Sequence, residues 1–474
     1  MENLSVIDRV PVELWHGIFL LALQTWLSPN DAGDVIDGIL LFYDRCESVV
    51  EYKRIENTRK QLRTVCRIWK AVVDDLGISF TFSDFLDDTE LAESELPTAT
   101  RLEFRWKQSC ECERCPHLFW NDQGDTGASP REYERRVTAP RHIATQNLDT
   151  FNPEQVRVIL FRDRAADIRS VSHWAAFGGS IRGLDSQDGI QVGPVFERLT
   201  HLSLSVLPDR LKGTYRFPHL RFLQLSLSMG MYFWYPTSSY APLSNWALPK
   251  LVSLVVRGEI SDRYEEDLLQ FLHSHISKIQ DLVLGYTNDH HTPYRVDMKL
   301  LRQYPRLKTL GLALDTLSSI TDDLANEEEG IESKEGAHIA AAAPSLICKS
   351  LLLDEFIQLI ELGRDLLQYH AEQCVRLCAP PTALFERMVI AYSWEELCNL
   401  YERRMACQTL DNCVVIQQLP SPVVFFETVY QSGIKSIDRE GVELWEGSGL
   451  RFLERMREID RDPESLVAPR VDVV

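Results

Sequence analysis

Two stretches near the N-terminus, Pro11 to Leu23 and Leu62 to Leu76, carry apolar residues at helical spacing. The spacing is i, i+3, i+4 and i+7, which places these side chains on one face of a helix. In the first stretch they are Trp15, Ile18, Phe19 and Ala22, and in the second Leu62, Val65, Cys66, Trp69 and Val73. We therefore predict two helices that pack together, the first opened by Pro11 and the second ended by Gly77.

The segment between them, Trp26 to Thr58, is predicted to hold a further helix. Asn30 or Asp31 would cap its N-terminus. Its apolar positions are Val35, Ile36, Ile39, Leu40 and Tyr43. The pattern leaves open whether this segment supports the face formed by the helical pair or obstructs it.

An internal repeat dominates the chain after Gln155. Five segments place apolar residues two positions apart, and each follows a further apolar residue upstream. Their middle leucines, which lie 21, 31, 28 and 28 residues apart, are Leu202, Leu223, Leu254, Leu282 and Leu310. Leucine-rich repeats run about 20 to 29 residues with one short strand each. We therefore predict an irregular leucine-rich-repeat solenoid of α/β class.

A solenoid of this kind stacks its strands into a curved parallel sheet that helices cover on the convex side. The side chains predicted to point to the concave face are Ser203, Gln224, Val255, Val283 and Gly311. Additional strands are expected at Arg101 to Trp106, Val158 to Phe161, Ile168 to Val171, Arg387 to Ala391 and Cys413 to Gln417. Helices are expected around Leu352 to Leu367, at Glu395 to Arg404 and at Leu450 to Glu458.

These patterns divide the chain into four parts. The predicted parts are a helical module (1–80), a junction of irregular strands and loops (81–153), the solenoid (154–450) and a C-terminal cap or tail (451–474). Two insertions interrupt the solenoid, an aromatic one from Met229 to Trp246 and an acidic one from Thr321 to Ala337, which should be solvated.

The aromatic insertion is a candidate substrate-binding loop. Its aromatic side chains either pack over the solenoid edge or form a contact surface, because Tyr and Trp supply rigid contact area at recognition sites. The candidate contact residues are Tyr232, Trp234, Tyr235 and Tyr240.

Composition narrows the functional class. A formal net charge of -20 argues against nucleic acid as the main partner. No apolar run reaches the roughly 18 residues that a membrane span needs, and the N-terminus lacks a signal-peptide pattern. The 11 cysteines are an odd number and several fall on apolar segments, which fits reduced thiols. We expect a soluble protein of the cytoplasm, the nucleus or both.

Little in the sequence predicts chemistry. Nucleotide-binding, hydrolase and metalloprotease motifs are missing, so we expect no enzyme activity and no cofactor. Four soft side chains at Cys110, Cys112, Cys115 and His117 would fit zinc, but structural zinc sites draw their ligands from two separated pairs. An exposed loop with free thiols is the favoured alternative. The run from Asp289 to His291 is interpreted as a solvated turn.

The N-terminal residues resemble an F-box. The likeness covers about the first 80 residues and rests on Pro11-Val12-Glu13-Leu14-Trp15, Ile18-Phe19, Leu62 and the closing Val65-Cys66-Arg67-Ile68-Trp69. The family usually has Leu where Val10 stands, and its two motifs lie closer together. The resemblance implies a helical module that docks onto the small Skp adaptor of cullin-RING ubiquitin ligases, while the rest of the chain holds a protein substrate.

The resemblance also indicates which residues dock the adaptor. They are Pro11, Leu14, Trp15, Ile18, Phe19, Leu62, Val65 and Trp69. Some of these must instead hold the module to itself, and Trp69 is the expected internal anchor. The alternative is a repeat scaffold in which Trp15 and Phe19 cap the first repeat and have no link to a ligase. A third reading, an enzyme hidden in the aromatic loop, would need a pocket with convergent polar groups.

Overall fold

The structure is a computed structural model of all 474 residues. It describes residues 10–22, 35–42, 55, 57–75, 101–104, 154–161, 179–186, 197–204, 216–227, 243–258, 262–285, 301, 303–312, 348–353, 364–378, 384–399, 401–402 and 422–461. The chain divides into two compact units. The first comprises Met1–Ser226 and Trp234–Leu251, and the second comprises Leu227–Phe233 and Val252–Val474.

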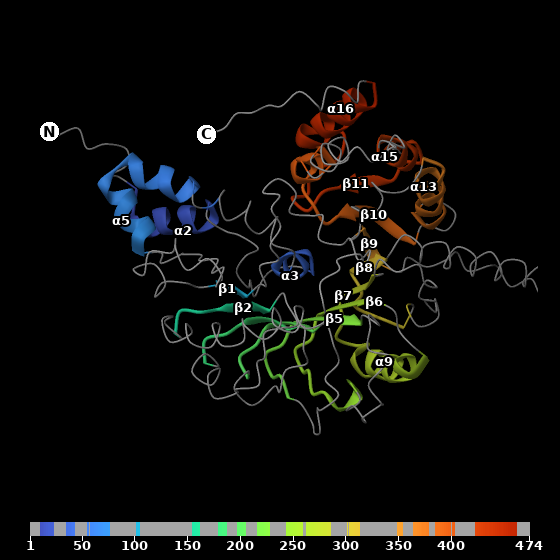
Figure 1. The fold of residues 1–474 in the computed structure, drawn as a ribbon, viewed down its shortest axis with the longest axis horizontal. Coiled ribbons are helices and arrows are strands. Elements are labelled where there is room, and N and C mark those ends of the chain that lie inside the picture. The colour runs from blue at the N-terminus through green and yellow to red at the C-terminus, as the bar shows by residue number, and fades with distance from the viewer. Residues whose placement is uncertain are drawn as a thin grey trace, which may run out of the picture. The chain divides into compact units, whose positions relative to one another are not determined.

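The first unit carries a sheet of short strands that pair in sequence order (Figure 1). Every described pairing is parallel, as one strand per repeat predicts. Its strands are β1 (Arg101–Phe104), β2 (Val158–Phe161), β3 (Gly183–Ser186), β4 (His201–Leu204) and β5 (Phe222–Leu227). The strands expected near residues 101 and 158 are confirmed, whereas β3 was not predicted because it carries a single large apolar residue, Leu184.

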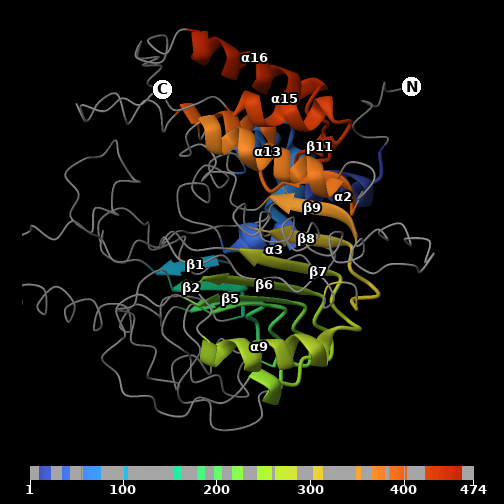
Figure 2. The same cartoon turned by 90° about the vertical axis from the view of Figure 1, so that its right-hand side faces the viewer.

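The second unit also carries short parallel strands that pair in sequence order, and its described residues include several α-helices. Its strands are β6 (Ser253–Gly258), β7 (Asp281–Gly285), β8 (Thr309–Leu312), β9 (Cys348–Leu353), β10 (Phe385–Ile390) and β11 (Lys435–Ile437). Its helices are α9 (Asp262–His275), α13 (Arg364–Cys378), α15 (Val423–Gln431) and α16 (Gly447–Arg461), with a further helical segment at 394–399. Figure 2 shows α13, α15 and α16 gathered at the β10–β11 end of this unit and α9 at its β6 end.

The repeat leucines form the core on one face of each sheet. Leu202 pairs with Leu223 in the first unit, and Leu254, Leu282 and Leu310 pair in register in the second. All five are buried, which confirms the prediction from their spacing. The strand expected at Arg387 is confirmed as β10, but the helical prediction around Leu352 is wrong at that residue. Leu352 lies in β9, where consecutive leucines are buried on both faces of the sheet.

The side chains predicted to point to the concave face lie on the face opposite the repeat leucines, and they are not open to solvent. Ser203, Gln224, Val255 and Val283 are all buried. In the second unit, Val283 lies over Gly311, since a Cβ at Gly311 would come within 2.7 Å of its Cγ1. At this point of the second unit, a neighbouring side chain therefore fills the face.

In the first unit the inner face is covered by α3 (Val35–Leu41), the helix predicted between the two N-terminal stretches. Phe42, at its C-terminal end, packs on Phe222 of β5 with ring centroids 5.9 Å apart. Both terminal nitrogens of the buried Arg101 guanidinium donate to the Leu41 carbonyl at 3.2 Å, which fixes the helix to β1. The segment between the two predicted helices therefore contains a helix that packs on the sheet of the first unit.

Candidate functional site

The helical pair predicted from the N-terminal pattern is present. Its first member, α2 (Val12–Ala22), begins directly after Pro11, whose carbonyl accepts from Leu14 N at 3.0 Å. Residues 57–65 are also helical, and α5 (Arg67–Asp75) follows after a break at one residue, Cys66. Helices α2 and α5 pack against each other.

The break at Cys66 corrects the prediction of one continuous helix. Cys66 caps the start of α5, since its Sγ accepts from Trp69 N at 3.4 Å and its carbonyl accepts from Lys70 N at 3.0 Å. The first N–H groups of a helix have no partner within the helix, and here Cys66 supplies one. A salt bridge of 2.9 Å between Arg63 and Asp74 joins the two segments across the break.

An aromatic cluster holds α2 against α5. The ring centroids of Trp15 and Phe19 each lie 4.8 Å from that of Trp69, and those of Trp15 and Phe19 lie 5.6 Å apart. Phe19 is 1% exposed, and Val72 and Val73 of α5 are buried as well. Edge-to-face and tilted ring pairs at these separations each contribute about 0.5–1.5 kcal/mol beyond the burial of area. This cluster is therefore the core of the helical pair.

A different set of apolar side chains faces solvent on α2, on α5 and on the helical segment that precedes α5. Leu14 is 58% exposed, Ile18 48% and Val65 51%. Two further neighbours, Val12 and Ile68, are exposed as well. These five residues are called the docking face below. Leu14 and Ile18 are four positions apart on α2 and so lie on one side of that helix.

The structure thus divides the eight residues that the sequence singled out. Trp15, Phe19 and Trp69 lie in the aromatic cluster, Leu14, Ile18 and Val65 belong to the docking face, Pro11 is exposed at the start of α2, and Leu62 is half-buried. Sequence reasoning missed Val12 and Ile68. The signal available for Ile68 was its place between Cys66 and Trp69 in the closing motif.

The remaining candidates fall mostly outside the described residues. This applies to Tyr232, Trp234, Tyr235 and Tyr240, to Cys110, Cys112, Cys115 and His117, and to the run from Asp289 to His291. One aromatic residue of the insertion is described: Trp246 is buried and packs on Phe217 at 5.6 Å between ring centroids. At this position the packing alternative holds.

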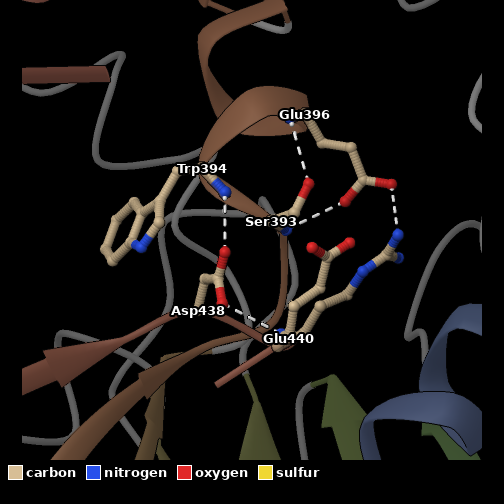
Figure 3. Close-up of polar contacts among 6 residues, drawn as sticks. Ser393, Trp394, Glu396, Asp438 and Glu440 are labelled. Atoms are coloured by element: carbon tan, nitrogen blue, oxygen red, sulfur yellow. Dashed lines mark hydrogen bonds and ion pairs between the residues drawn. The ribbon is translucent and has the colours of Figure 1, made fainter. Parts of the chain in front are cut away.

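A polar network in the second unit was not predicted (Figure 3). Ser393 and Glu396 form a capping box at the start of the helical segment at 394–399: Glu396 accepts from Ser393 N at 2.9 Å, and Ser393 Oγ accepts from Glu396 N at 3.3 Å. The S-x-x-E spacing was the sequence signal for it. Glu396 also accepts from Arg439 at 2.6 Å.

Asp438 completes this network from the turn after β11. It is 1% exposed and accepts three backbone N–H bonds, from Trp394 at 3.2 Å, Glu440 at 3.0 Å and Val442 at 2.8 Å. Each of these donors is a backbone N–H, so the carboxylate joins the start of the helical segment at 394–399 to the turn after β11.

Buried thiols in the second unit are also unsuited to chemistry. Burial raises the pKa of Cys348 and of Cys378 to about 12, and it raises the pKa of Cys374 as well. A thiol must ionise to act as a nucleophile or metal ligand, so these residues behave as small apolar side chains. Among the described residues, no group of three His, Cys, Asp or Glu side chains could hold a metal ion.

Comparisons with protein-family models, with curated proteins and with solved structures found no match. Within the described part of the chain, no helix combines the length and apolar character needed to span a membrane.

Proposed function

We propose that this chain is the substrate-recognition subunit of a Skp-cullin-F-box ubiquitin ligase. The docking face binds the Skp adaptor, and the repeat units bind a protein substrate. Ubiquitin transfer is performed by other subunits, so the chain needs no catalytic group or cofactor of its own.

The proposal rests on the exposed apolar side chains of the helical pair. The rings of Trp15, Phe19 and Trp69 pack on one another. In contrast, about half of the surface of Leu14, of Ile18 and of Val65 is exposed to solvent. Single exposed apolar residues are common, but five of them within α2, α5 and the helical segment before α5 favour an interaction surface. These residues also belong to the F-box-like motifs.

The same observation favours docking over the scaffold alternative. A capping role would direct Trp15 and Phe19 into the first repeat. Instead both rings pack on Trp69, within the helical pair itself. The exposed side chains of the docking face are all aliphatic, which suits an apolar groove on a partner.

Calorimetry with purified Skp adaptor and the full-length chain tests the proposal. Truncating a buried apolar anchor at an interface costs about 2 kcal/mol or more. The double variant Leu14→Ala, Ile18→Ala should therefore bind at least about 100-fold more weakly, because each 1.4 kcal/mol is tenfold in affinity. Leu450→Ala is a matched control, since Leu450 is a 38% exposed leucine on α16.

Two results would contradict the proposal. One is no measurable binding of the adaptor by the wild-type chain. The other is equal affinity of the wild-type chain and a double variant whose circular dichroism spectrum and melting temperature are unchanged.

A further inference from the structure

Three arginines of the first unit gather around the turn that precedes β3. The backbone carbonyls of residues 179, 180 and 181 each accept a hydrogen bond from one of them, at 3.1, 3.2 and 3.3 Å. The donors are, in the same order, Nη1 of Arg198, of Arg157 and of Arg182. Because the acceptors belong to consecutive residues, the three positive charges are confined to one short stretch of the surface.

This cluster belongs to a row of residues that runs along the edge of the sheet. Arg157 and Arg182 stand directly before β2 and β3, and Thr200 and Arg221 stand directly before β4 and β5. Their backbones are hydrogen-bonded in sequence order, since each carbonyl of the first three accepts from the N–H of the next residue in the row at 2.8–2.9 Å. Neighbouring strands lie about 4.8 Å apart, so the row spans about 14 Å.

Two of the arginines in the cluster keep donors for a further partner. Arg157 and Arg198 are exposed, and each uses only Nη1. A guanidinium carries five N–H donors, so the edge formed by Nε and Nη2 has no partner among the described residues. Neither arginine forms an ion pair within the described part of the chain, although the exposed Glu154 and Glu197 lie within three positions of them in the sequence.

The charges of the cluster favour an anionic ligand. Like charges held close together repel, and an anion placed between them relieves this repulsion. The planar guanidinium fork matches a carboxylate, which it binds through two parallel hydrogen bonds. The formal net charge of -20 does not prevent such binding, because salt screens charges beyond about 8 Å at physiological ionic strength.

We propose that Arg157, Arg182, Arg198 and Arg221, called the arginine edge below, bind an extended acidic segment of a protein. Carboxylates of the segment pair with the free guanidinium edges of Arg157 and Arg198. An extended chain rises about 3.3 Å per residue, so roughly five residues cover the row. The inference rests on the proposed function for identifying this partner as the substrate, and it adds the chemical class of the segment that the first unit recognises.

Fluorescence anisotropy with the full-length chain tests the proposal. The probe is a labelled peptide of five glutamates flanked by glycines, and the same peptide with glutamines is the control ligand. The double variant Arg157→Gln, Arg198→Gln should bind the glutamate peptide at least about tenfold more weakly than the wild-type chain, since it loses charge-assisted hydrogen bonds. The matched control is Arg306→Gln, Arg451→Gln, which removes two exposed arginines of the second unit and should leave the affinity unchanged.

Three results would overturn the proposal. They are the absence of binding of the glutamate peptide by the wild-type chain, equal affinity of the two double variants, and tighter binding of an oligothymidylate than of the peptide. Adaptor binding is measured separately on the same chains. A chain that binds the adaptor but not the peptide contradicts this inference alone, whereas a chain that binds the peptide but not the adaptor contradicts the proposed function.

Chemical protection on the wild-type chain separates ligand binding from a purely structural role for these arginines. Phenylglyoxal modifies accessible guanidinium groups, and mass spectrometry locates the products. Saturating glutamate peptide should slow modification at Arg157 and Arg198 several-fold and leave Arg306 and Arg451 unchanged. If the arginines only bind the carbonyls of the turn, the peptide will protect neither.

The single variant Arg198→Gln covers the case in which the double variant does not fold. Its hydrogen bond to the carbonyl of residue 179 is exposed, so the fold depends little on it. This variant should bind the glutamate peptide several-fold more weakly than the wild-type chain. An unchanged affinity would contradict the proposal.

Discussion

Replacing Gly38 by alanine should lower the free energy of unfolding relative to the same replacement at a helical glycine with free space around it. The added Cβ would fall within 2.8 Å of Phe222 Cγ. The ring cannot easily yield, because it is 2% exposed and lies between His201 and Phe42 at 5.7 and 5.9 Å between centroids. Overpacking of this kind costs about 1–3 kcal/mol.

Gly17→Ala is the matched control, since Gly17 also lies in a helix but a Cβ there would meet nothing within 4 Å. Alanine is favoured over glycine in a helix by about 1 kcal/mol, and both substitutions gain this amount. Gly38→Ala should therefore be less stable than Gly17→Ala by about 1–3 kcal/mol, which is the overpacking cost alone.

Urea denaturation of the full-length chains, followed by circular dichroism, measures this difference. Hydrogen exchange at residues 35–41 shows whether the loss arises at α3. If Gly38→Ala proved as stable as Gly17→Ala, with exchange at α3 unchanged, the seating of α3 on Phe222 would be refuted.

Three further predictions concern the aromatic cluster, the polar network and the thiols. Trp69→Ala should lower the free energy of unfolding by about 3 kcal/mol, whereas Trp69→Phe, which keeps an aromatic ring against Phe19, should lose much less in urea titrations. Asp438→Ala should cost about 3 kcal/mol by leaving three backbone N–H groups without their acceptor, and equal stability of the variant and wild type in urea would contradict this role. Because the pKa of Cys348 and of Cys378 is raised to about 12, both thiols stay protonated at pH 8 and should resist iodoacetamide in the native chain; mass spectrometry should show them labelled only after denaturation, and fast labelling of either in the native state would contradict their burial.

The repeat strands could be predicted because their signal is local. Each strand places leucines two positions apart, and the core needs those side chains on one face, so Leu202, Leu254 and Leu310 reveal their strands without knowledge of the rest of the chain. The short strand β3 lacks this pattern, and it exists because β2 and β4 pair with it on either side.

The inner face could not be predicted because its burial comes from residues far away in sequence. Gly38 resembles a weak point in a helix until Phe222, which lies nearly two hundred residues later, is seen against it. Helical periodicity likewise groups Ile18 with Phe19, although Phe19 packs on Trp69 and Ile18 faces solvent. Spacing gives the width of an apolar stripe but not which part of it the partner helix covers.

The central claim is that Leu14, Ile18 and Val65 are exposed in the free chain because a Skp adaptor covers them in the complex. Hydroxyl-radical footprinting of the full-length chain, alone and with saturating adaptor, measures this coverage residue by residue. We predict that oxidation falls several-fold at these three side chains and at Ile68, while Leu450 is oxidised equally in both samples. A complex that forms without protection of the docking face, or the absence of any complex, would contradict the account.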